Sequence, residues 1–257
     1  MKSAASTIYG PVRSWRLGLS LGVDLLCRDS ICSFECVYCQ LGKINRVTAK
    51  RALFVSTAKV LRDLQKTDWK AADVITFSGS GEPTLAANLG EVIEKIKHLT
   101  HKPIVVLTNS TLLHDEKVRL EISKADRIFC KLDAWSDDCL RRVNRPAGGI
   151  TLESIISGIF ELRREFSGFL AIQTMILRPP DDSEIAKLAE IFRRLNPAEV
   201  QLNLPSRPVP HEYFLETRGN SVEIKPDFTQ IKTISKNDLE NIRRKLSEIT
   251  KLPIITR

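Results

Sequence analysis

The sequence predicts an α/β protein, a partial (β/α)6 barrel built on a parallel sheet, with a short C-terminal helical extension. Two observations support this fold class. Short apolar runs alternate with stretches of helical periodicity along most of the chain, and six runs of strand character can be counted. Strands that alternate with helices form parallel βαβ units. Six units are fewer than the eight of a closed barrel, so we expect the barrel to be open.

The six expected strands lie at residues 17–26, 74–77, 104–107, 126–132, 169–177 and 199–204. Two glycines, Gly18 and Gly22, interrupt the first of them and weaken its strand character. Apolar residues at helical spacing predict helices at 88–99, 115–123, 137–143, 151–166 and 183–195. Asn88 followed three residues later by Glu91 has the pattern of a capping box at the start of the first helix.

The character of the chain changes after the sixth strand. Residues 205–210 contain three prolines, so we expect an extended segment there rather than a helix. A final helix is expected at 236–250, with Ser235 and Asp238 at its start. We therefore divide the chain into a core domain at residues 9–210 and an extension at 211–257 that packs on the core.

The composition is that of an ordinary globular protein. The chain has 257 residues, of which 42% are hydrophobic and 27% charged, which excludes disordered and collagen-like proteins. No stretch approaches the roughly 18 apolar residues of a membrane span. The first ten residues contain no apolar core of a signal peptide. We therefore expect a cytoplasmic protein without a membrane partner, and its oligomeric state stays open.

The positive charge is concentrated at the start of the chain. The whole chain carries a formal net charge of +8, and residues 1–66 alone account for +7, with 11 Lys and Arg against 4 Asp and Glu. A solvated basic loop would explain this charge without any function. The functional alternatives are an RNA partner, or an acidic electron donor such as flavodoxin or ferredoxin that docks beside a redox centre.

The segment Cys32-Ser-Phe-Glu-Cys36-Val-Tyr-Cys39 is the strongest functional signal. It directly follows the first strand, at the C-terminal edge of the sheet, where α/β barrels place their active sites. Cysteine thiolates are the usual ligands of iron–sulfur clusters, and three ligands on a four-iron cube leave one iron open. Cys27 lies five residues earlier and could complete a structural zinc site or an electron-transfer cluster. From the spacing alone, a three-cysteine cluster with an open iron and a four-cysteine metal site both stay open. A third alternative is that the cysteines are plain buried thiols.

The C-x3-C-x2-C spacing, with an aromatic residue just before the last cysteine, resembles the radical S-adenosylmethionine (SAM) enzymes. The resemblance implies that Cys32, Cys36 and Cys39 hold a [4Fe-4S] cluster whose fourth iron is chelated by SAM. Reduction of the cluster then cleaves SAM to a 5′-deoxyadenosyl radical that abstracts a hydrogen atom from the substrate. Tyr38 matches the aromatic position that packs against the adenine, and Cys27 matches no position of the family's motif.

The turn after the second strand, Ser78-Gly-Ser-Gly-Glu-Pro-Thr84, resembles the Gly-Gly-Glu-Pro motif of the same superfamily, which binds the amino group of SAM. Glycines let backbone carbonyls approach a ligand closely, and a carboxylate favours an ammonium group. The resemblance assigns these roles to Gly79, Ser80, Gly81 and Glu82, with Ser80 in place of the first glycine.

Polar residues at the ends of later strands extend the expected cofactor site. Asn109, after the third strand, matches a position that often contacts the ribose or carboxylate of SAM. Gln173, in the fifth strand, is a polar residue in an apolar run, so we expect it to face the barrel lumen and the cofactor. The loop residues Asn144 and Arg145 lie on the same face and could hold an anion or serve as ordinary turn residues.

Residues 10–24, the cysteine segment and Gln40-Leu41-Gly42 are together similar to a group of small radical SAM proteins related to the tRNA wyosine synthases. The similarity spans about residues 9–210 and implies RNA modification. No cysteine precedes Cys27, so the second cluster of the wyosine synthases is not expected. The alternatives are a radical SAM enzyme that modifies a peptide or small molecule, a non-catalytic four-cysteine metal protein, and a redox sensor.

Overall fold

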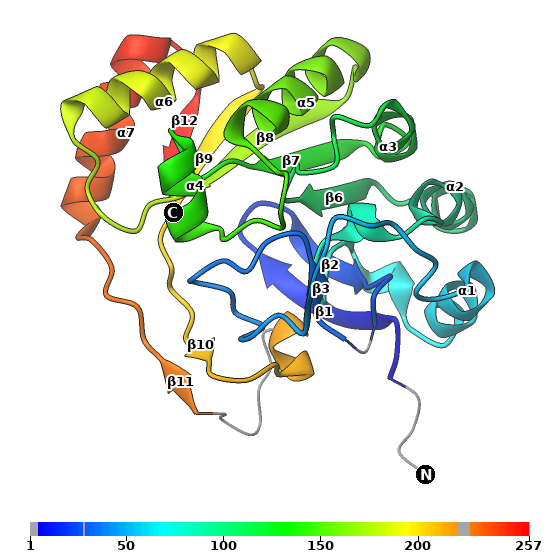
Figure 1. Cartoon of the computed structure of the whole chain (residues 1–257). Coiled ribbons are helices and arrows are strands. Elements are labelled where there is room, and N and C mark those ends of the chain that lie inside the picture. The colour runs from blue at the N-terminus through cyan, green and yellow to red at the C-terminus, as the bar shows by residue number, and fades with distance from the viewer. Residues whose placement is uncertain (1–4, 28, 220–226, 257) are drawn as a thin grey trace.

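The computed structural model describes residues 5–27, 29–219 and 227–256 and is built around one eight-stranded sheet (Figure 1). The strands of this sheet are β1 (Ile8–Ser14), β2 (Gly18–Val23), β5 (Val74–Phe77), β6 (Ile104–Thr108), β7 (Arg127–Lys131), β8 (Phe169–Met175), β9 (Glu199–Asn203) and β12 (Ile254–Thr256). Their order is β1-β2-β5-β6-β7-β8-β9-β12, and all neighbours from β2 onward are parallel. Because β1 and β12 are opposite edges, the sheet is an open, partial barrel.

The six strands expected from the sequence, β2 and β5–β9, are confirmed, and two edge strands were not predicted. β1 pairs antiparallel with β2, and it contains Pro11, which only an edge strand accommodates readily. β12 is three residues long and pairs with β9. Gly22, which weakened the prediction of β2, lies under the ring of Tyr9: a Cβ there would come within 2.1 Å of that ring.

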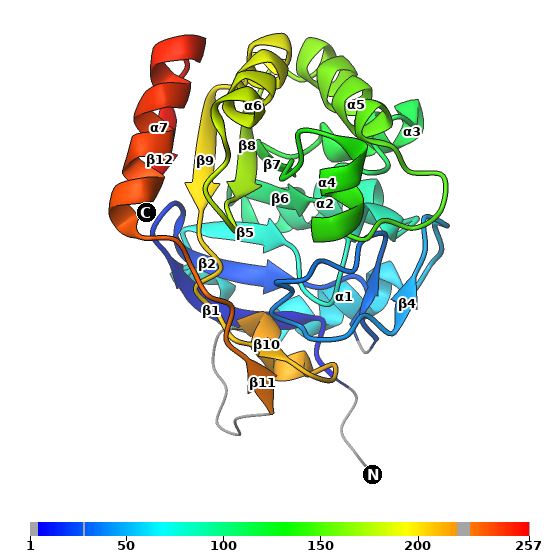
Figure 2. The same ribbon diagram turned by 60° about the vertical axis from the view of Figure 1, so that its left-hand side comes forward.

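Seven helices are described: α1 (Thr57–Gln65), α2 (Leu89–Thr100), α3 (Glu116–Ile122), α4 (Asp137–Val143), α5 (Leu152–Glu165), α6 (Asp182–Leu195) and α7 (Lys236–Thr250). Figures 1 and 2 show α1, α2, α3, α5 and α6 along the outer side of the sheet, with α7 beside α6. The sequence predicted all of them except α1. That helix buries only Val60 and Leu64, so its apolar period is too sparse to stand out.

Short elements complete the fold. Two small sheets are formed by β3 (Ile31–Cys32) with β4 (Arg46–Val47) and by β10 (Val209–Pro210) with β11 (Phe228–Thr229). Three 3-10 turns are η1 (Trp69–Ala71), η2 (Pro83–Leu85) and η3 (Leu215–Gly219). Among the described residues, none of the helices is long and apolar enough to cross a membrane.

The capping box expected at Asn88 and Glu91 is wrong. Asn88 is the N-cap residue of α2, but its side chain makes no capping hydrogen bond. Its amide instead donates to the Val55 carbonyl at 3.0 Å and to Thr57 Oγ1 at 3.1 Å, and Thr57 Oγ1 donates to Glu91 at 2.7 Å. The pair therefore ties α2 to the start of α1, a contact that local sequence does not show. At α7 the expected cap is confirmed, because Ser235 Oγ accepts from the Asp238 amide at 3.0 Å.

The main core lies between the sheet and the outer helices, and the inner face of the sheet has its own small core. This inner core contains Val74, Val105, Phe129 and Ala171. Beyond residue 210, α7 contacts α6 through the ion pair between Lys245 and Asp182, 2.7 Å apart, and β12 extends the sheet. The division of the chain at residue 210 into two parts stays a prediction.

Candidate functional site

The three clustered cysteines lie in a loop that a second segment holds in place. Cys32 ends β3, and Cys36 and Cys39 follow in the turn beyond it. Residues 143–147, which begin at the last residue of α4, run beside residues 33–37 and form backbone hydrogen bonds with them. These bonds are Val37 N to Val143 O at 3.0 Å, Glu35 N to Asn144 O at 2.9 Å and Ala147 N to Ser33 O at 2.9 Å. All three thiols are free and only partly buried.

Two asparagine amides donate hydrogen bonds to two of the cysteine sulfurs. Asn109 Nδ2 lies 3.4 Å from Cys32 Sγ and 2.8 Å from Ser33 Oγ. Asn144 Nδ2 lies 3.4 Å from Cys36 Sγ. Both asparagines are buried, with 7% and 1% of their surface exposed. Such N–H···S contacts orient a thiolate ligand and stabilise its negative charge, which raises the potential of an attached cluster. Asn144, which the sequence analysis placed in a loop on this face, therefore contacts the cysteine loop.

Tyr38 is anchored through its hydroxyl. This hydroxyl donates to Asp133 Oδ2, which also accepts from Asn144 Nδ2 at 2.7 Å, while Asp133 Oδ1 accepts from the Met175 amide at 2.8 Å. Burial and the nearby Asp133 carboxylate raise the pKa of Tyr38 well above its usual value. The Lys131 ammonium lies 4.9 Å from the ring centroid. The ring is therefore fixed in orientation beside the cysteines, and its contact with an adenine stays a prediction.

Without a metal, the cysteine thiols favour their protonated form. Burial is the main cause: it raises the pKa of Cys36, raises that of Cys39 to about 12, and raises that of Cys32 well above the usual range. A metal centre binds thiolates and releases these protons. Within the part of the chain that the structure describes, no group of three or more His, Cys, Asp or Glu side chains is arranged to hold a metal ion.

The fourth cysteine considered for a metal site, Cys27, does not join the three clustered thiols. Cys27 is directed elsewhere: its Sγ donates to the Ala5 carbonyl at 3.3 Å, and its neighbouring charges are Asp24, Arg218 and Lys59. The four-thiolate zinc site considered from the sequence therefore finds no support in the geometry.

The glycine turn packs directly against the strand that carries Cys32. Gly79 and Gly81 have φ angles of 137° and 152°, which favour glycine. A Cβ on Gly81 would lie 1.7 Å from the Ile31 carbonyl oxygen, and one on Gly79 would lie 2.5 Å from the Asp24 carboxyl carbon. Ile31 N donates to the Ser80 carbonyl at 3.0 Å. The two loops expected to bind cluster and cofactor are thus adjacent.

Glu82 is 2% exposed and its carboxylate is bound inside the turn. Oε1 accepts from Thr84 N at 3.0 Å, Thr84 Oγ1 at 2.6 Å and Thr108 Oγ1 at 2.7 Å, and Oε2 accepts from Asn109 N at 2.6 Å. Burial raises the pKa of Glu82 although these four bonds lower it. The four donors match the lone-pair capacity of a carboxylate. Glu82 therefore joins the glycine turn to the end of β6, and its contact with an ammonium group stays a prediction.

A buried ion pair that no sequence pattern predicts lies beside the same turn. Asp24, 1% exposed, accepts from Ser80 Oγ at 2.5 Å and from Arg218 Nη1 at 2.8 Å. Tyr213 Oη, from the same segment as Arg218, donates to Ser80 Oγ at 3.2 Å. The segment at 211–219 thus covers the glycine turn. Asp24 and Arg218 are 194 positions apart, so no local pattern could reveal the contact.

Gln173 lies on the inner face of the sheet, level with Lys131 on β7 and Gln201 on β9. Its Nε2 donates to Gln201 Oε1 at 2.9 Å, and Arg16, from the β1–β2 hairpin, donates to the same oxygen at 2.8 Å. No hydrogen bond described here joins Gln173 to the cysteine loop or the glycine turn. Its contact with the cofactor stays a prediction. This contact of Arg16 was not predicted, because its partner Gln201 lies on β9, 185 positions away in the sequence.

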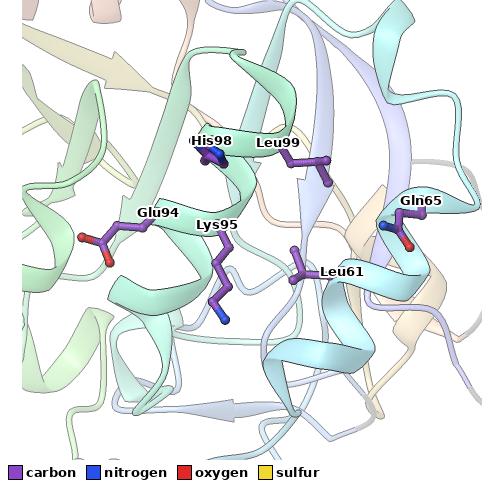
Figure 3. Close-up of a pocket in the computed structure, with 6 residues that line it drawn as sticks. All are labelled: Leu61, Gln65, Glu94, Lys95, His98 and Leu99. Carbon is purple, nitrogen blue, oxygen red and sulfur yellow. The ribbon is translucent and has the colours of Figure 1, made fainter.

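An open groove lies elsewhere, between α1 and α2 on the outer side of the sheet (Figure 3). It is lined by Leu61, Gln65, Glu94, Lys95, His98 and Leu99. None of the expected site residues lines it, so we assign it no part in the chemistry of the cysteine loop.

Comparison with known proteins identifies the family of this chain. A family model described as the radical SAM superfamily matches residues 30–192. The chain is 48% identical to the UPF0026 protein of Synechocystis, over 99% of this chain and 97% of that protein. It is 36% identical to the UPF0026 protein of Methanocaldococcus jannaschii, over 80% of this chain and 65% of that one. A probable GTP 3′,8-cyclase of Saccharolobus islandicus is 25% identical over 67% of this chain and 53% of that protein.

Solved structures show a similar fold. SuiB of Streptococcus suis bound to S-adenosylmethionine superposes with a TM-score of 0.61 at 15% identity, over 89% of this chain. A radical SAM methyltransferase from Sphaerobacter thermophilus gives 0.58 at 17% identity, over 93% of this chain and 66% of that one. The chain covers only about half of SuiB, 48% of its length. At these identities the likeness establishes the fold and leaves the substrate open.

Proposed function

Because this chain belongs to the radical SAM superfamily, whose members are enzymes that use a [4Fe-4S] cluster and SAM, we propose that it cleaves SAM reductively at a cluster held by Cys32, Cys36 and Cys39. The observation that carries the proposal is the contact between two loops. The turn at Gly79–Glu82 is hydrogen-bonded to β3, the strand that ends in Cys32. A cofactor bound by the turn would therefore lie beside the cluster.

The donor set fits such a cluster. Three thiols from one loop supply three ligands, and no described contact brings the fourth thiol, Cys27, to the group. The amides of Asn109 and Asn144 stabilise the negative charge of two of these sulfurs. When bound, the cluster supplies the electron that cleaves SAM, and the resulting 5′-deoxyadenosyl radical starts hydrogen abstraction.

This chain's residues would then orient SAM and exclude water. The missing side chains at Gly79 and Gly81 leave the backbone carbonyls of the turn accessible to an ammonium group. Glu82 holds the turn against β6, and Asn109 lies between the turn and Cys32. Tyr38, fixed by Asp133, presents its ring beside the third cysteine for an adenine to pack against.

The basic first quarter of the chain supports two partners, and both are proposals. An acidic electron donor would reduce the cluster, and an RNA would be the substrate, as the similarity to proteins related to the wyosine synthases implies. RNA binding through phosphates would weaken steeply as salt rises, because bound counterions are released. A peptide or a small molecule is the alternative substrate. Each would lose a hydrogen atom by the same chemistry, so adding a peptide or a small molecule in place of RNA tests these alternatives.

Electron paramagnetic resonance tests the contact between SAM and the cluster. The protein is reconstituted anaerobically with iron and sulfide, reduced, and measured with and without saturating SAM. We expect SAM to change the g values of the reduced cluster, because one iron has no protein ligand. The same change is expected in Cys27→Ala. A spectrum that saturating SAM leaves unaltered, or a protein that takes up zinc in place of iron, would contradict the proposal.

A further inference from the structure

A basic surface patch lies immediately beside the cysteine loop. We call it the β4 patch and define it by five exposed residues, Lys43, Arg46, Val47, Lys50 and Leu53. Val47 and Leu53 are large apolar side chains that are 39% and 62% exposed. In the described parts of the chain, none of the three cations forms an ion pair with a carboxylate. The patch therefore combines unneutralised positive charge with exposed apolar side chains.

The sequence around the patch contains no compensating charge. From Cys36 to Arg62 there is no Asp or Glu, while six Lys and Arg residues occur. Two of these six are neutralised by acids from elsewhere, Arg51 by Glu121 and Lys59 by Asp63. Lys43, Arg46 and Lys50 therefore create a positive local potential. This potential attracts acidic surfaces over roughly 10 Å at moderate salt.

Backbone hydrogen bonds connect the patch to the first expected cluster ligand. Val47 in β4 is paired in register with Cys32 in β3. Thr48 N donates to the Cys32 carbonyl at 2.9 Å, and Arg46 N donates to the Ser30 carbonyl at 3.0 Å. In the described structure β4 pairs only with β3, so a molecule seated on the patch would be one strand away from Cys32.

We propose that the β4 patch docks an acidic protein that carries one electron to the cluster. This inference rests on the proposed function, because reductive cleavage of SAM consumes one electron per event. The carrier's reduced centre is oxidised by one electron, and the cluster is reduced by the same electron. Charge complementarity accelerates the encounter, and Val47 and Leu53 supply the apolar contact that a transient protein interface needs.

The chemistry of the patch favours a protein over RNA. Single-stranded RNA is held mainly by phosphate contacts together with bases stacked on aromatic rings. The five residues of the patch include no aromatic ring. Phe54, next to Leu53 in the chain, is half-buried and is covered by the Arg46 guanidinium, 5.3 Å from the ring centroid. The exposed apolar residues are a Val and a Leu, which suit a protein surface.

Charge reversal tests the proposal with two reductants. The variant K43E/R46E/K50E and the unaltered protein are reconstituted, and the rate of cluster reduction is followed anaerobically by absorbance. One series uses reduced flavodoxin as an acidic protein donor, and the other uses dithionite, a small reductant that needs no docking surface. We expect the flavodoxin rate of the variant to fall at least tenfold at low salt, within the range of electrostatic steering. The dithionite rate is expected to stay unchanged.

The matched control reverses three exposed cations on α6 and α7, as K187E/R193E/R244E. Figure 2 shows β4 and α7 on opposite sides of the molecule. The control variant has the same net charge as the patch variant, and we expect it to keep at least half of the flavodoxin rate. An equal loss in both variants, or an unchanged flavodoxin rate in the patch variant, would overturn the proposal.

Two further outcomes separate the possible errors. If K43E/R46E/K50E keeps its flavodoxin rate but loses binding of a single-stranded RNA oligonucleotide, the patch serves RNA and the docking proposal is wrong. If dithionite fails to reduce a cluster in the unaltered protein, the proposed function itself is contradicted, whatever the patch does.

Discussion

Replacing Cys36 with Ala is expected to abolish formation of the iron–sulfur cluster and with it all cleavage of SAM. The two remaining thiolates of the loop, Cys32 and Cys39, cannot hold a four-iron cube. The Asn144 amide would also lose the sulfur to which it donates at 3.4 Å. The measurement is the iron and sulfide content of each chain after anaerobic reconstitution, together with the visible absorbance of the cluster.

The matched control for this change is Cys27→Ala. Cys27 is a buried thiol whose Sγ donates to the Ala5 carbonyl, away from the loop. We expect Cys27→Ala to bind as much iron as the unaltered protein and to lose only a modest amount of stability. If Cys27→Ala lost iron as completely as Cys36→Ala, the site would be a four-thiolate centre, and the non-catalytic alternative would be favoured.

Replacing Arg218 with Leu is expected to lower the free energy of unfolding by about 3–5 kcal/mol. Arg218 contacts Asp24 at 2.8 Å, and their side chains are only 9% and 1% exposed. Without the guanidinium, the Asp24 carboxylate is left buried beside the glycine turn without that cation. The change is measured by chemical denaturation of the protein without its cluster, so that loss of iron cannot contribute.

Two further variants make this result specific. Arg243→Leu removes the cation of an exposed pair with Glu240, and we expect a much smaller effect, because water and salt screen such a pair. Combining Arg218→Leu with Asp24→Asn removes both charges, and part of the lost stability should return, because the buried charge is gone. A loss for Arg218→Leu no larger than that for Arg243→Leu would contradict the importance of the buried pair.

The sequence predicted the centre of the fold well because its signal is periodic. The strands β5–β8 are apolar runs, each followed by an amphipathic helix, and that alternation is typical of a parallel sheet. The edges follow other rules. β1 contains a proline and pairs antiparallel, β12 is too short to show a period, and α1 buries two residues. Such elements are defined by their neighbours in space, so the sequence alone does not reveal them.

The same distinction holds for the site. The spacing of the cysteines and the glycine turn could be found from the sequence, because the residues of each motif are contiguous. The residues that support them are not contiguous: Asp133 anchors Tyr38, and Arg218 neutralises Asp24. Likewise, the motif does not reveal that the Glu82 carboxylate joins the glycine turn to the end of β6, and its contact with a ligand stays a prediction.

The measurement that tests the central claim most directly is the formation of 5′-deoxyadenosine. The reconstituted protein is incubated anaerobically with SAM and a strong reductant, and the product is quantified by mass spectrometry. We predict that 5′-deoxyadenosine accumulates with the unaltered protein and with Cys27→Ala, and is absent with Cys36→Ala. A protein that carries a complete, reduced cluster with SAM bound, yet forms no 5′-deoxyadenosine with or without an added RNA or peptide substrate, would contradict the account.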